Sequence, residues 1–110
     1  MREIKFRAWD EHKKKMIYDL KLIYESYIDN ISIGNWLQFT GLLDKEGKEI
    51  YEGDIVKVNT PSGIKGVFQI VYEHAQFIIS KKKISSYSQL REVFYLSEVI
   101  GNIYENKELV

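Results

Sequence analysis

The residues of this chain that could perform acid–base or metal chemistry are concentrated in one short segment. Residues 44–54 contain five acidic residues and two lysines, which gives the segment a net charge of −3. Paired carboxylates can transfer protons or hold a hard metal ion, and Glu52 and Asp54 would share one face of a strand. Asp44 and Asp54, however, stand where turns and caps require a side-chain acceptor. We therefore expect no catalytic residue and no metal ligand in this segment.

Other arrangements that support catalysis are missing from the sequence. The chain has no cysteine, and its two histidines, His12 and His74, fall in predicted turns, where exposed residues without a catalytic role are usual. The glycines at 41, 47 and 53 lie in separate breaks and match no phosphate-binding loop. The sequence therefore predicts a protein that is not an enzyme and that needs no cofactor.

A basic region follows the acidic segment. Residues 57–91 hold six cationic side chains against Glu73 alone, a net charge of +5. Small β-barrels bind single-stranded nucleic acid with lysines on the phosphates and aromatic rings on the bases. The zero net charge of the whole chain argues against strong nonspecific binding. The candidate nucleic-acid-binding residues are Lys57, Lys65, Lys81, Lys82, Lys83 and Arg91.

The separation of acidic from basic segments favours a different role, contact with another protein. Regions of opposite sign favour head-to-tail contacts between copies, and a net charge of zero removes self-repulsion. We therefore expect a non-catalytic interaction module that forms a homo-oligomer or binds a foreign protein, with nucleic-acid binding as the alternative. The candidate interaction surface comprises Trp9, Asp44, Glu46, Glu49 and Glu52.

The composition predicts one domain that is mainly β. The chain has 110 residues, of which 45% are hydrophobic and 14% aromatic, and alanine occurs only twice. Abundant β-branched and aromatic residues favour strands, and the length suits a single domain over residues 1–110. No apolar stretch approaches the roughly 18 residues of a membrane helix, and the charged start resembles no signal peptide. We expect a cytoplasmic protein with no membrane partner.

Alternation and turn residues place the elements along the chain. They predict a small barrel or a strongly coiled antiparallel sheet with SH3-like elements and at most one short helix. Residues 20–31 fit a helix, with Asp19 as the N-cap, and a hairpin about equally well. The predicted elements are a hairpin over 3–19, a strand over 36–40, turns over 44–47 and 60–63, a three-stranded meander over 54–80, a short helix or turn over 84–97 and a strand over 98–104.

The same patterns predict which side chains are buried. Trp36 is expected in the core, whereas Trp9 sits at a strand end on the charged face and is expected to be more open. The other predicted core residues are Ile4, Phe6, Phe39, Val56, Val58, Val67 or Phe68, Ile79, and Ile100 or Ile103.

Three stretches of the sequence resemble one known family. They are REIKFRAWD at 2–10, QFTGLLDKEGKEIYEGDIVKV at 38–58 and VIGNIYENKEL at 99–109. Their order and spacing are similar to those of the YopX family of phage and prophage proteins, although Lys107 stands where the family often has proline. The resemblance implies a phage or prophage origin and action in the bacterial cytoplasm. Many small phage proteins act by binding a host or phage protein, so such a protein is the expected foreign partner. The resemblance implies no activity and no site residues.

Overall fold

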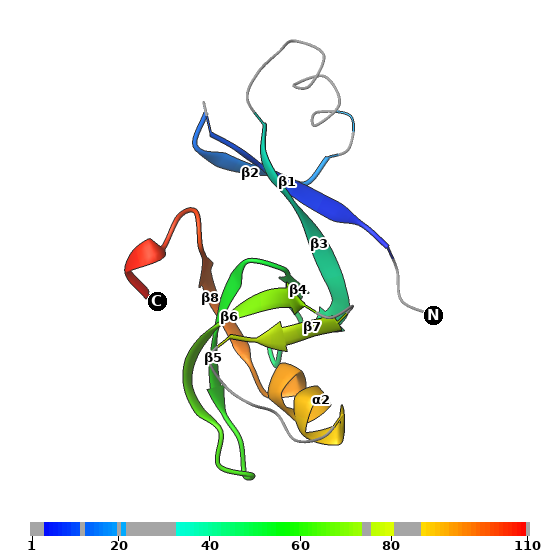
Figure 1. Cartoon of the computed structure of the whole chain (residues 1–110), viewed down its shortest axis with the longest axis vertical. Helices are drawn as coiled ribbons and strands as arrows, with labels where there is room; N and C mark the ends of the chain where they lie inside the picture. Colours follow the sequence, from blue (N-terminus) through cyan, green and yellow to red (C-terminus); the bar gives the residue numbers. More distant parts are fainter. Residues whose placement is uncertain are drawn as a thin grey trace. The chain divides into compact units, whose positions relative to one another are not determined.

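The computed structural model describes residues 4–11, 13–19, 21, 33–73, 76–80 and 87–109 (Figure 1). The chain divides into two compact units, residues 1–39 and residues 40–110. The described strands are β1 (Phe6–Asp10), β2 (Lys15–Ile17), β3 (Ile33–Leu43), β4 (Glu49–Tyr51), β5 (Asp54–Asn59), β6 (Lys65–Glu73), β7 (Gln76–Ile79) and β8 (Glu98–Asn102). The described helices are α2 (Tyr87–Tyr95) and the 3-10 turn η1 (Lys107–Leu109). The fold is therefore mainly β with one short α-helix, as the composition predicts.

The first unit is built on the hairpin predicted over 3–19. Strands β1 and β2 pair antiparallel with Ala8 opposite Ile17, and β1 also pairs antiparallel with β3. The turn between β1 and β2 is held by Asp10, whose carboxylate Oδ1 accepts a hydrogen bond from the backbone N–H of Lys13 at 3.0 Å. Lys14, in the same turn, has a φ of 55°. A polar turn thus joins two short strands.

Burial along β1 differs from the predicted alternation. Ile4 and Phe6 are 71% and 36% exposed, so neither belongs to the core, whereas Trp9 is only 4% exposed. Arg7, which shares a face with Trp9, is 3% exposed, so the face expected to be charged and open is a covered one. The pairing of β1 with β3 also shifts register between Ala8 and Asp10, as at a bulge.

Trp36 is the second correction in this unit. Its side chain is 50% exposed, although the sequence predicts a core position. The ring packs edge-on against Phe6, with the two centroids 6.3 Å apart. Both residues lie on the same face of the β1–β3 pair, because Ala8 stands opposite Trp36 and Phe6 opposite Gln38. The aromatic pair therefore forms a partly exposed surface of the first unit.

The second unit contains a strongly curved antiparallel sheet with strand order β7-β6-β5-β8. Strands β5, β6 and β7 follow one another as the predicted meander, and β8 pairs with the free side of β5 (Figure 1). The predicted turn over 60–63 joins β5 to β6, with the backbone N–H of Gly63 donating to the carbonyl of Thr60 at 3.0 Å. This half-barrel confirms the prediction of a small barrel or coiled sheet.

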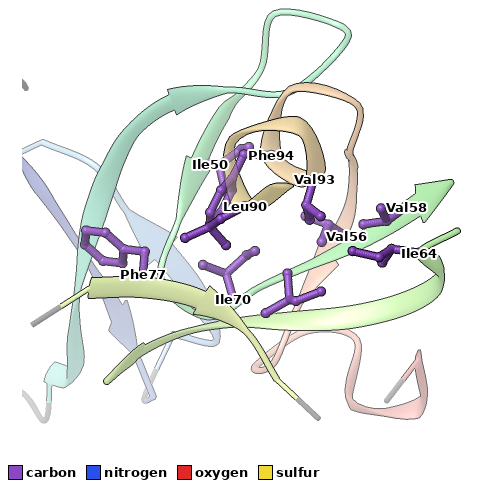
Figure 2. Packing of buried hydrophobic residues seen from close by; sticks show 10 residues of the cluster. Ile50, Val56, Val58, Ile64, Ile70, Phe77, Leu90, Val93 and Phe94 are labelled. Carbon is purple, nitrogen blue, oxygen red and sulfur yellow. The ribbon is translucent and has the colours of Figure 1, made fainter. Parts of the chain in front are cut away.

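Helix α2 covers the inner face of this sheet. Leu90 and Val93 of the helix belong to one buried cluster with Val56 and Ile70 of the sheet, and Figure 2 shows these side chains facing one another. Of the helix or turn predicted over 84–97, the structure has the helix, over Tyr87–Tyr95, and its apolar period is the reason that it packs there. The full cluster comprises Ile50, Val56, Val58, Ile64, Ile70, Phe77, Ile79, Leu90, Val93 and Phe94.

The core predictions hold in part. Phe39, Val56, Val58 and Ile79 are buried, as predicted. Of the paired alternatives, Phe68 packs against the cluster while Val67 is 42% exposed, and both Ile100 and Ile103 are half-buried.

The segment that fitted both helix and hairpin, residues 20–31, lies outside the described residues except for Lys21. The backbone N–H of Lys21 donates to Oδ1 of Asp19 at 2.8 Å, the contact that an N-cap residue makes. Within the described part of the chain, no helix is both long and apolar enough to cross a membrane.

Candidate interaction groove

The second unit carries a surface groove with a volume of about 370 Å³. It lies between the turn that follows β3 and the exposed side of α2, so it is built from segments some fifty residues apart in the sequence. Its volume is at the low end of the range for ligand pockets, about 300–1,000 Å³. The lining residues are Leu42, Leu43, Asp44, Lys45, Gly47, Arg91, Phe94 and Tyr95.

The first side of the groove is a turn organised by Asp44. The carboxylate Oδ1 of Asp44 accepts hydrogen bonds from the backbone N–H groups of Glu46 and Lys48, both at 2.9 Å. Gly47 completes the turn with a φ of 82°, a conformation that side chains other than glycine and asparagine disfavour. The turn predicted over 44–47 is thus confirmed, along with its mechanism.

The same carboxylate also fixes the turn to strand β8. Oδ2 of Asp44 accepts from the backbone N–H of Val99 at 2.9 Å, and the N–H of Lys45 donates to the carbonyl of Ser97 at 2.9 Å. Burial raises the pKa of Asp44, but hydrogen bonds from Val99, Lys48 and Glu46 and the nearby Lys48 charge outweigh it. The net effect lowers the pKa of Asp44 below its usual value of 3.8, so the group is ionised at neutral pH.

The second side of the groove is the solvent face of α2. Phe94 is 2% exposed and belongs to the core, so it closes the base of the groove. Arg91 and Tyr95 are four residues apart and therefore lie on one side of the helix. Tyr95 is 74% exposed, and Arg91 is also exposed. The helix thus places an aromatic ring and a cation at the rim.

The exposed part of the groove is largely apolar. Leu42 and Leu43, at the end of β3, are 36% and 51% exposed. Burial of apolar surface is favourable by roughly 25 cal/mol per Å², so these side chains and Tyr95 would gain from being covered. Lys45 stands beside them, with its Nζ 4.0 Å from a carboxylate oxygen of Glu98. The groove therefore combines an apolar surface with two cationic residues, Lys45 and Arg91.

The predicted acidic surface is divided by the structure. Asp44 and Asp54 are 6% and 2% exposed, and Oδ2 of Asp54 accepts from the backbone N–H of Tyr51 at 2.8 Å. These two aspartates therefore perform the turn and cap roles that their positions indicate. Glu46 is exposed, while Glu49 and Glu52 are half-buried.

Two members of the predicted interaction surface need correction. The side chain of Asp44 is buried and engaged with three backbone N–H groups, so it offers no open carboxylate. Trp9 is buried too, and its indole N–H donates to Oε2 of Glu11 at 2.8 Å. The role predicted for Glu46, Glu49 and Glu52 stays a prediction.

The predicted basic set does not form one patch among the described residues. Lys57 stands opposite Val67 of β6, which places Lys57 and Lys65 together on the outer face of the sheet. Arg91 lies on α2, which covers the inner face. Glu98 of β8 stands opposite Lys57 and opposes its charge. Lys81, Lys82 and Lys83 lie outside the described residues.

Sequence reasoning missed the apolar residues of the groove, Leu42, Leu43 and Tyr95. A pattern for them exists, because two adjacent leucines precede a tight turn and a strand can direct only one of them to a core. For Tyr95 the indication is its place in the helix. Leu90, Val93 and Phe94 form the buried side of α2, and Tyr95 falls outside that side, so its ring is exposed to solvent.

The groove contains little that could perform acid–base or metal chemistry among its described lining residues. Its one carboxylate, Asp44, is occupied by backbone donors, and the described residues include no cluster of three histidine, aspartate or glutamate side chains able to hold a metal ion. The expected absence of a metal and of a cofactor stays a prediction.

The fold and the groove together define a class, a small mainly β protein with a half-barrel sheet, one covering helix and a mixed apolar and cationic groove. The chain belongs to the YopX protein family, whose model matches residues 20–110. It is also similar to the crystal structure of protein EF1440 from Enterococcus faecalis, with a TM-score of 0.65 and 25% identity over 99% of each chain. A search of curated proteins found no match.

Proposed function

We propose that this protein is a non-catalytic interaction module that contacts another protein through the groove between the 44–47 turn and α2. The observation that supports this function most directly is the exposure of Leu43 and Tyr95, at 51% and 74%, on two sides of one groove. Aromatic and aliphatic side chains around a depression are the usual anchors of a protein interface.

The state of Asp44 supports a role without catalysis. A general acid or base near neutral pH needs a carboxyl pKa raised toward that pH, whereas the pKa of Asp44 is lowered. Both oxygens of Asp44 also hold backbone N–H groups that a reaction would have to release. The Asp44 carboxylate therefore has a structural role, since it holds the turn that forms one side of the groove.

The family match guides the choice of partner. We place the protein in a phage or prophage and its action in the bacterial cytoplasm, with a host or phage protein as the first candidate partner and a second copy of the chain as the other. Nucleic-acid binding is the weaker alternative, because Lys57 and Lys65 lie on the opposite side of the sheet from Arg91 and because Glu98 stands opposite Lys57.

The experiment that tests this function is affinity capture from the bacterial host with variants that separate the groove from the rest of the surface. The immobilised full chain is compared with Leu43→Asp and Tyr95→Asp, which place a charge in the groove. The control is Val67→Asp, an exposed strand residue on the outer face of the sheet. We expect a protein that the unmodified chain and the Val67 variant retain and that both groove variants lose.

Two results would contradict the proposal. One is capture of the same proteins by all four chains, which would move the contact away from the groove. The other is a nuclease-sensitive capture that Lys57→Glu and Lys65→Glu abolish, which would favour the nucleic-acid alternative. Circular dichroism and thermal unfolding verify that each variant is folded before it is compared.

A further inference from the structure

We draw no further inference here: the strongest candidate, the partly exposed aromatic pair of Phe6 and Trp36 on one face of the β1–β3 pair, is an apolar surface patch, and nothing among the described residues shows what covers it.

Discussion

The carboxylate of Asp44 accepts a hydrogen bond at 2.9 Å from the backbone N–H of Val99, fifty-five residues further along the chain. The other oxygen of the same carboxylate holds the local turn through Glu46 and Lys48. One side chain therefore shapes the turn and attaches it to β8. This double role explains how an exposed turn can hold Lys45 and the end of β3 in place opposite α2.

Replacement of the Asp44 carboxylate should destabilise the protein, and the loss should be larger for alanine than for asparagine. Asp44→Ala leaves three backbone N–H groups without their acceptor and should lower the free energy of unfolding by about 2–3 kcal/mol. Asp44→Asn keeps one acceptor oxygen for the turn and should cost about 1–2 kcal/mol. Urea denaturation measures both. Equal stability of the alanine variant and the parent would show that these bonds add nothing.

The stability conferred by Asp44 should depend on pH in a defined direction. Because folding lowers the pKa of Asp44, its contribution is complete above the unfolded pKa of about 3.9 and is lost as the pH falls through the folded pKa. The difference in unfolding free energy between the parent and Asp44→Asn should therefore shrink below about pH 4. A difference that grew on acidification would contradict the assignment. Urea unfolding across this range decides.

The core of the second unit should be sensitive at Ile70, which is fully buried between the sheet and α2. Ile70→Ala should lower the free energy of unfolding by about 2–5 kcal/mol, because it removes apolar contacts and leaves a cavity. Val67→Thr is the control on the same strand, since Val67 is 42% exposed, and should change stability by about 0.5 kcal/mol or less. Similar losses for both variants would place the core elsewhere.

The protein should associate with itself to a measurable degree at high concentration. Light scattering at several concentrations should give a molar mass above the 13.0 kDa of one chain. Exposed charge pairs between copies contribute only about 0–1 kcal/mol each, so apolar contact must supply most of the affinity. Leu43→Asp should therefore reduce the association. A strict monomer at low salt would leave a foreign protein as the partner.

The purified protein should bind no divalent metal ion tightly. The carboxylates of Asp44 and Asp54 accept hydrogen bonds from backbone N–H groups. Among the described residues, no three histidine, aspartate or glutamate side chains lie close enough together to hold a metal ion. Calorimetric titration with magnesium, manganese and zinc should give no stoichiometric binding. A one-to-one complex of micromolar affinity or better would disprove this and reopen the enzyme hypothesis.

Local features of the fold followed from the sequence because their causes are local. An aspartate three residues before Gly47 predicts the 44–47 turn, and the structure shows the φ of 82° and the Asp44 acceptor that this pattern requires. Alternating Val56 and Val58 predict a strand with both side chains in the core, and both are buried in β5. The spacing of Leu90, Val93 and Phe94 fits a short helix or a turn, and the structure has the helix α2 there.

The exposure of the two tryptophans could not be predicted from local sequence patterns. The two-residue period divides a strand into two faces, but it does not say which of the two is covered. Arg7 and Trp9 share one face of β1 and are both buried, whereas Phe6 and Trp36 lie on the other face and are 36% and 50% exposed. The charge of Arg7 predicts an open face around Trp9, and only the packing of the unit shows that this face is the covered one.

The groove depends on tertiary structure, because it is built from segments that are far apart in the sequence. Composition, period and turn residues act within a few positions, so they indicate a mainly β chain and the places of its turns. The presence of Lys45 and Arg91 in one groove depends on α2 packing against the inner face of the sheet and on the hydrogen bond from Val99 to Asp44. Contacts between positions this far apart cost chain entropy, and the burial of the whole apolar cluster offsets that cost. No short sequence pattern therefore encodes them.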